Sequence, residues 1–238
     1  KEALGFHVSG HPLDQWREAI RTFCSTDSVG MREMQHDAPV VVGGLITRIR
    51  PTTTKQGKKM AMMTLADQRG TVDGVLFADT FVKYGELLQM DRCVLLLGFA
   101  DRQRAEPCVI VDRVVPIDQA AQHLAEGLDI FAPGVAGPDG EPVEPTLKML
   151  AGILKQASGS VASLQGRPVK VAVHLELEHE RVSLASAAFR VVADAQLLDR
   201  IRRLLGPNSV RVRGGYLPPR RAPRGDWKAR RAAESVEA

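Results

Sequence analysis

The fold is decided by residues 40–77, which read VVVGGLITRIRPTTTKQGKKMAMMTLADQRGTVDGVLF. Apolar and β-branched residues gather in three runs of this segment, and that enrichment predicts three strands. The strands span residues 40–49, 60–66 and 71–77. Asp67–Gly70 is a short hairpin connection, whereas residues 50–59 make a longer, polar one. Gly43 and Gly44 suit the bulge or sharp bend that a small closed barrel requires.

The next residues extend this pattern with one helix and two more strands. Residues 80–89 read as a helix, and residues 92–100 and 108–115 read as strands. The order β-β-β-α-β-β is that of a five-stranded Greek-key barrel, the OB-fold. We therefore expect residues 40–116 to form an OB-fold nucleic-acid-binding domain.

The segments on either side of the barrel read as helices and a linker. Residues 1–39 are a helical segment, in which Pro12 follows a turn and begins a helix with four large apolar residues on one face. These residues are Leu13, Trp16, Ile20 and Phe23. Residues 117–146 hold a short helix, from an N-cap at Asp118 to a stop at Gly127, and then an acidic stretch rich in Pro and Gly. We expect this stretch to be a linker.

Residues 147–217 predict a second small domain with the order α-β-β-α-β. A helix follows Thr146, strands span 169–177 and 182–192, a helix is capped by Asp194, and a last strand spans 210–216. The acids Glu176, Glu178 and Glu180 share the solvent face of the first strand by period-2 logic. Residues 218–238 are rich in Pro, Arg and Gly with little apolar bulk, so we expect a disordered basic tail. The fold class is mixed, a β barrel followed by an α+β domain.

The composition is that of a globular protein. The 238 residues are 44% hydrophobic and 25% charged, which excludes a wholly disordered or fibrous chain. No apolar run approaches the roughly 18 to 20 residues of a membrane span, and no signal peptide is evident, so we expect a soluble cytoplasmic protein without a membrane partner. The first residue is Lys1, not Met, which we interpret as the mark of a fragment.

The net charge of +4 conceals blocks of opposite sign. The net charges are −2 for residues 1–39, +3 for 40–116, −6 for 117–146, +4 for 147–205 and +5 for 206–238. The barrel and the C-terminal half are therefore basic, and an acidic segment separates them. Basic blocks of this kind favour an anionic partner.

Metal and catalytic signals are weak. The three cysteines are widely spaced and the six histidines are scattered, without a Cys-x-x-Cys or His-Glu-x-x-His motif, so we expect neither a disulfide framework nor a metal site. Ser9 and His11 lack an orienting acid, and no phosphate-binding glycine loop occurs. Asp67, Asp73 and Asp79 are most simply surface groups beside hairpins. We assign no catalytic residue and no cofactor to these residues.

The strongest functional signal is the connection at residues 48–59, which carries five positive charges and no acid. In OB-folds this first long loop flanks the face that binds oligonucleotides. Cationic side chains neutralise phosphates, and hydroxyl groups donate hydrogen bonds to phosphate oxygens. Phe77, at the end of the third strand, is the candidate for base stacking. The nucleic-acid-binding candidates are Arg48, Arg50, Thr52, Thr53, Thr54, Lys55, Lys58, Lys59 and Phe77.

Several motifs resemble the C-terminal region of the alpha subunit of bacterial DNA polymerase III. They are Leu4–Leu13 (LGFHVSGHPL), Thr52–Met60 (TTTKQGKKM), Val75–Phe77 with Tyr84 after it, Ile117-Asp118 and Gly127-Leu128. The resemblance covers roughly residues 1–217. It implies a single-stranded-DNA-binding OB-fold and then a domain that docks the tau subunit of the clamp loader, in support of DNA-directed DNA synthesis.

The resemblance also implies what lies outside these residues. The family carries its polymerase aspartates, the Mg²⁺ they bind and its sliding-clamp motif upstream, so those features are expected only in the parent chain. The basic tail from Pro218 extends past the resemblance. Two alternatives stay open: a protein-interaction scaffold in which the basic loop is incidental, and the tRNA-binding OB module of a synthetase. The Ser9–Pro12 stretch does not fit the second.

Overall fold

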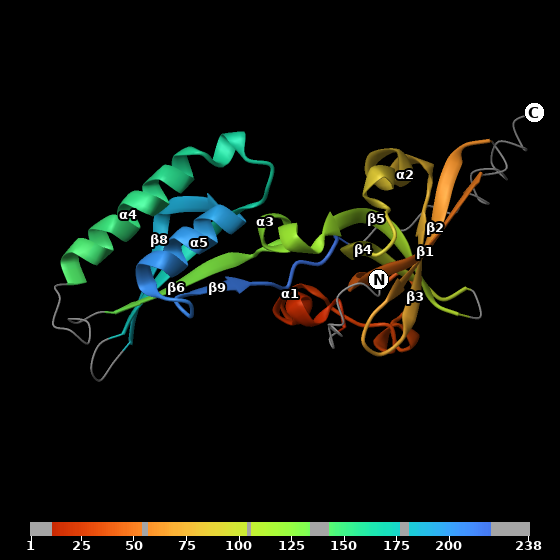
Figure 1. The fold of residues 1–238 in the computed structure, drawn as a ribbon, viewed down its shortest axis with the longest axis horizontal. Coiled ribbons are helices and arrows are strands. Elements are labelled where there is room, and N and C mark those ends of the chain that lie inside the picture. The colour runs from red at the N-terminus through yellow and green to blue at the C-terminus, as the bar shows by residue number, and fades with distance from the viewer. Residues whose placement is uncertain (1–10, 54–56, 104–105, 134–142, 177–180, 220–238) are drawn as a thin grey trace, which may run out of the picture.

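Two sheets, each with its own helices, make up the computed structural model (Figure 1). The structure describes residues 11–53, 57–103, 106–133, 143–176 and 181–219. The first sheet closes on itself, and the second is an open sheet of four strands.

The closed sheet is a barrel with the strand order β1-β2-β3-β5-β4. The strands are β1 (Pro39–Thr53), β2 (Lys59–Ala66), β3 (Thr71–Leu76), β4 (Cys93–Asp101) and β5 (Cys108–Pro116). Only the β3–β5 pairing is parallel among the five that the structure describes in this sheet. Alternate side chains of every strand fill the interior, as period-2 geometry requires. The predicted OB-fold is confirmed.

Strand β1 takes part in both halves of the barrel. Leu45 pairs with Cys93 of β4 and also with Ala66 of β2, so the strand passes from one partner to the other at this point. The register then shifts between Ile46 and Arg48. A Cβ on Gly44 would lie 2.9 Å from the carbonyl oxygen of Ala66, so a residue without a side chain lets the two backbones approach.

One end of the barrel is covered by the short helix α2 (Ala78–Tyr84) and the 3-10 turn η3 (Gly85–Leu87). Phe81, Tyr84 and Leu87 pack against the barrel core. The helix begins earlier than the predicted 80–89 because Phe77, still extended at φ −70° and ψ 168°, is its N-cap. It ends earlier because the chain tightens into a 3-10 turn at Gly85.

The N-terminal helix docks on the outside of the barrel. After the turn η1 (Asp14–Trp16), α1 spans Arg17–Phe23, and η2 spans Gly30–Arg32. Leu13 and Phe23 are buried. Phe23 joins a second apolar cluster with residues of β1, β4 and β5, and Trp16 and Ile20 pack against that cluster. The apolar face expected for this helix is therefore used against the barrel.

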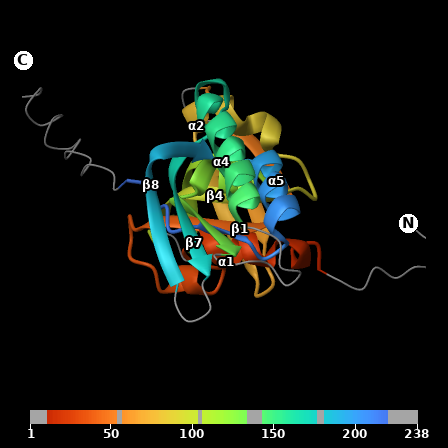
Figure 2. The same ribbon diagram turned by 90° about the vertical axis from the view of Figure 1, so that its left-hand side faces the viewer.

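The second sheet has the order β8-β7-β6-β9. Its strands are β6 (Gly127–Pro133), β7 (Pro168–Glu176), β8 (Arg181–Val192) and β9 (Val210–Arg213). The turn η4 (Ile117–Gln119) and the helix α3 (Ala120–Leu124) precede it, and α4 (Val143–Gly159), η5 (Val161–Ser163) and α5 (Ala195–Leu205) complete the unit. Figures 1 and 2 show α4 and α5 on the same side of this sheet.

The linker expected after the short helix begins later than predicted, because strand β6 occupies its first residues. Residues 127–133 form a central strand, although part of the segment was predicted to be linker and Gly127 a helix stop. The strand has alternating burial, with Leu128, Ile130 and Ala132 inside, but a single acid and the nearby Pro and Gly residues concealed the pattern. Helix α4 likewise begins at Val143, not after Thr146. The rest of the expected linker, 134–142, and the tail from residue 220 lie outside the described residues.

The two units share an apolar contact. Val212 of β9 and Tyr216 pack against the cluster formed by the barrel and by Ile117, Ala120 and Leu124. A Cβ on Gly214 would collide with the backbone of Thr22 in α1, so the segment after β9 runs directly beside that helix, as Figure 1 also shows. No helix among the described residues is long and apolar enough to cross a bilayer.

Candidate nucleic-acid interface

The connection between β1 and β2 is largely a two-stranded ribbon. Strand β1 continues to Thr53, where it pairs with Lys59. The polar loop predicted at residues 50–59 is therefore shorter, because cross-strand hydrogen bonds satisfy the backbone of most of it. Thr54 and Lys55 lie outside the described residues. The remaining candidates are held on strands or beside them, in a fixed register.

The register places three rows of side chains on the outer face of the barrel. Paired residues in neighbouring strands point to the same face of a sheet. One row runs from Arg48 through Thr64 and Asp73, and the next from Arg50 through Met62, Val75 and Ile110. The third begins with Thr52 and Met60. Arg48, Arg50 and Thr52 thus form a polar border along β1, next to a more apolar strip on β2.

Phe77 extends the third row. Leu76 pairs with Ala61 and is fully buried, and the chain is still extended at the following residue. By alternation Phe77 points outward, level with Met60, and its side chain is 45% exposed. The predicted stacking residue is therefore at the surface and on the same face as the arginines.

The two arginines of β1 are available to an anion. Within the described part of the chain, Arg48 and Arg50 are exposed and make no ion pair. Lys58 and Lys59 are exposed at the tip of the ribbon. The carboxylate of Asp73 accepts a hydrogen bond of 2.7 Å from the Thr64 hydroxyl, which turns the acid toward β2. A polyanion could therefore lie along β1 without displacing a salt bridge of the described residues.

Prediction from the sequence missed the β2 strip. Met60 and Met62 are half-buried on the outer face, between the arginines and Phe77. Methionine is flexible and polarizable, so it adapts to the faces of aromatic rings. No alternation in the sequence identifies them, because residues 60–63 (MAMM) are all apolar; only the structure, in which every second residue of the strand is buried, separates its two faces.

The acids that the sequence singles out do not come together. Asp67 caps the β2–β3 turn, Asp73 lies on β3, and Asp79 is in the first turn of α2. Glu176 is exposed and pairs with Arg181 at 2.7 Å. Among the residues that the structure describes, no three His, Cys, Asp or Glu side chains converge as metal ligands would. Glu178 and Glu180 lie outside the described ranges, as do Ser9 and its neighbours up to residue 10.

The matching family model describes this part of the chain as an OB-fold nucleic acid binding domain, over residues 40–117. Residues 40–117 thus match this family, and in the structure they contain the closed barrel of an OB-fold. The predicted barrel at 40–116 coincides with the match almost residue for residue. The candidate face described above therefore lies within the matched residues.

Curated relatives confirm the resemblance to polymerase subunits. The DNA polymerase III subunit alpha of Aquifex aeolicus is 32% identical over 133 residues, which cover 55% of this chain and 11% of the relative. The corresponding subunit of Escherichia coli is 25% identical over 218 residues, or 89% of this chain and 18% of the relative. That of Halalkalibacterium halodurans is 28% identical over 213 residues, with the same two shares. The matches thus cover 11 to 18% of the length of these relatives.

Solved structures are more distant. A domain of replication protein A from Methanococcus maripaludis aligns with 35% of this chain and 88% of its own length, at 10% identity and a TM-score of 0.30. A mitochondrial single-stranded DNA binding protein from Saccharomyces cerevisiae aligns with 34% of this chain and 93% of its own, at 11% identity and a TM-score of 0.29.

Proposed function

We propose that the barrel binds single-stranded DNA along the outer face of β1, β2 and β3. The observation that supports this most directly is the border of exposed arginines on β1, Arg48 and Arg50, which lies beside the apolar strip on β2 and the exposed ring of Phe77. Phosphates would lie along β1, where the hydroxyl of Thr52 also faces outward, and bases would contact Met60, Met62 and Phe77. Lys58 and Lys59 would hold the strand at the tip of the ribbon, and Thr54 and Lys55, outside the described residues, stay candidates for the same role.

We propose further that the chain belongs to a DNA polymerase III alpha subunit and supports DNA-directed DNA synthesis in the cytoplasm. Similarity that extends over 89% of this chain supports the assignment. The polymerase site with its Mg²⁺, and the contact with the sliding clamp, would then belong to other parts of the parent subunit. Residues 147–217, with β6 added, would dock the tau subunit of the clamp loader.

A fluorescence anisotropy titration with a labelled oligothymidine would test the barrel proposal. The variant R48A/R50A should bind more weakly than the wild type, whereas the control R32A/K83A loses the same charge from exposed positions of η2 and α2. An equal loss of affinity in both variants would mean that the effect comes from the net charge of the protein and not from these two arginines. No loss in R48A/R50A would mean that the β1 border does not bind phosphate.

The family model raises RNA as a second candidate ligand, because it carries the name tRNA anticodon. An oligouridine of equal length in the same titration separates the two, since tighter binding of RNA would favour the tRNA-type module. Absence of binding to both, together with capture by immobilised tau, would instead favour the protein-interaction scaffold.

A further inference from the structure

The second sheet has one face that no helix of the described residues covers. Helices α4 and α5 pack on the side that carries Leu128, Ile130 and Val171. The residues between these point to the opposite side, where the register places five cations on three strands. They are Lys170, Arg181, Arg190, Arg211 and Arg213, and all five are exposed. We call this side the open face.

An aromatic residue lies among these cations. The ring of Phe131 on β6 stacks with the imidazole of His174 on β7, with centroids 4.8 Å apart and 19° between the planes. The guanidinium carbons of Arg181 and Arg211 lie 5.5 and 5.6 Å from the centroid of the same ring. Cation–π contact restrains both arginines, and the N–H groups of Arg211 make no ion pair with another described residue, so they can bind an anion.

Acidic neighbours neutralise only part of this charge. Arg181 pairs with Glu176 at 2.7 Å, and Arg213 pairs with Asp129 at 3.2 Å. Lys170, Arg190 and Arg211 make no ion pair within the described ranges. Among the described residues, the open face therefore carries an excess of positive charge on these three side chains, which lie on strands whose spacing the sheet fixes.

His174 also contacts a serine and an acid, but the geometry is that of a surface network. Its Nδ1 is 2.8 Å from the Ser183 hydroxyl, whereas its Nε2 is 3.6 Å from Asp129, beyond hydrogen-bond range. Asp129 is closer to Arg213. The cluster consequently fixes the orientation of the His174 ring against Phe131.

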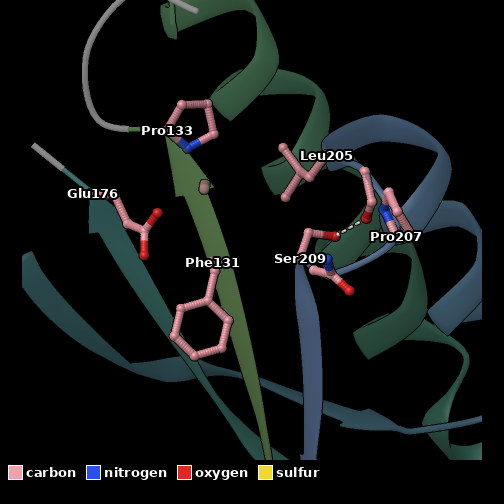
Figure 3. Close-up of a pocket in the computed structure, with 9 residues that line it drawn as sticks. Phe131, Pro133, Glu176, Leu205, Pro207 and Ser209 are labelled. Atoms are coloured by element: carbon pink, nitrogen blue, oxygen red, sulfur yellow. Dashed lines mark hydrogen bonds between the residues drawn. The ribbon is translucent and has the colours of Figure 1, made fainter.

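A hollow of about 460 Å³ opens at the end of the open face. Figure 3 shows Phe131, Pro133 and Glu176 on one side of it and Leu205, Pro207 and Ser209 on the other. Its volume is in the range of small-molecule sites, and Asn208 and Glu176 offer an amide and a carboxylate. The Ser209 hydroxyl donates to the Gly206 carbonyl at 2.7 Å, and the Ser209 carbonyl accepts from the Phe131 N–H at 2.7 Å. These bonds hold the wall of the hollow against β6.

We propose that the open face is a second binding site for single-stranded nucleic acid, with phosphates on Arg211, Arg190 and Lys170 and one base in the hollow beside Phe131. The ligand class rests on the proposed function of the barrel. The acidic side chains of a protein segment would pair with the cations, but they have no flat ring to place in a hollow bordered by an aromatic ring and two prolines. A nucleotide uses both, because it joins a phosphate to a flat ring.

The test compares R190A/R211A with the control K155A/R203A, whose two exposed cations lie on α4 and α5 over the opposite face. The probe is a labelled oligothymidine of about 30 nucleotides, longer than the roughly 4 to 16 that one OB-fold occupies. Loss of two phosphate contacts should lower the salt slope by about 1.4, equivalent to about tenfold in affinity at physiological salt. The control should bind like the wild type.

Photocrosslinking of the intact chain to an oligonucleotide with 5-iodouracil distinguishes this inference from the barrel proposal. Crosslinked peptides from both the barrel and residues 127–133 or 205–213 support both. Crosslinks confined to the barrel overturn the open-face site alone, and crosslinks confined to the second sheet overturn the barrel site alone. If R190A/R211A weakens binding of polyglutamate but not of the oligonucleotide, the open face takes an acidic protein and the inference is wrong.

Discussion

The carboxylate of Asp67 binds Ser28 through two hydrogen bonds, although the two residues are 39 positions apart. One oxygen accepts from the Ser28 N–H at 2.7 Å, and the other from its hydroxyl at 2.8 Å. The second oxygen also accepts from the N–H groups of Arg69 and Gly70 at 2.7 and 2.8 Å. Ser28 itself is only 7% exposed. One side chain therefore closes the β2–β3 turn and ties the N-terminal segment to it.

Replacement of Asp67 by Ala should lower the free energy of unfolding by about 2 to 3 kcal/mol, since it leaves the buried Ser28 groups without their acceptor. Urea denaturation measures the change. Asp73→Ala serves as the control, because this acid is exposed and accepts one hydrogen bond, so we expect a loss below about 1 kcal/mol. Equal losses in the two variants would contradict the structural role of Asp67.

The double variant R48A/R50A should reduce the dependence of DNA affinity on salt. Each phosphate contact with a single strand contributes about 0.7 to the slope of log K against log salt concentration, so two lost contacts should lower it by about 1.4. Titrations at several salt concentrations give the slope. An unchanged slope would show that neither arginine contacts a phosphate, whatever the affinity at one salt concentration.

Phe77→Ala should weaken DNA binding in a different way. Loss of one stacked base costs about 1 to 3 kcal/mol of binding free energy, and the salt slope should stay constant because no charge is removed. Val82→Ala, a change at an α2 residue that is 83% exposed, is the matched control. If the free energy of unfolding fell by as much as the free energy of binding, the loss of affinity would come from disturbed packing and not from a lost stacking contact.

Gly44→Ala and Gly152→Ala should change stability in opposite directions. A Cβ at Gly44 meets a backbone oxygen at 2.9 Å, which cannot move without disturbing β2, so we expect a loss of about 1 to 3 kcal/mol. Gly152 lies in α4, and a Cβ added there would meet no atom within 4 Å, so alanine should stabilise that helix by about 0.5 to 1 kcal/mol. Chemical denaturation of both variants measures the two changes in the free energy of unfolding. If Gly44→Ala stabilised the protein, the close approach of the β1 and β2 backbones at Gly44 would be wrong.

Acid should destabilise the protein through His123 of α3. Burial, and then the positive charge of Arg113, lower the pKa of this imidazole below 6.5. Between the pKa of His123 in the unfolded chain and its lower pKa in the folded protein, the folded state binds fewer protons. The free energy of unfolding is therefore not reduced by His123 above about pH 6.5, and it falls as the pH drops toward the pKa of the folded state. In the variant His123→Gln, the midpoint of unfolding should depend less on pH within that window. An identical pH profile for variant and wild type would exclude the contribution.

Local patterns predicted most of the elements. Runs enriched in apolar and β-branched residues identified the five barrel strands to within a few positions, and the side chain of Asp194 does cap α5, accepting from the Leu197 N–H at 2.7 Å. These features depend on neighbours in the sequence. Strand β6 was missed because Asp129, whose carboxylate pairs with Arg213 on another strand, made a central strand look like a linker.

The sequence by itself determined the OB-fold order, the apolar face of α1 and the density of charge at residues 48–59. Only the tertiary structure decided which of these side chains share a surface. Pairing across β1 and β2 aligned Arg50 with Met62, and the second sheet brought Phe131 together with Arg181 and Arg211. The physical reason is that strand register is fixed by hydrogen bonds and burial between distant segments, so a one-residue slip would turn each of these side chains to the other face.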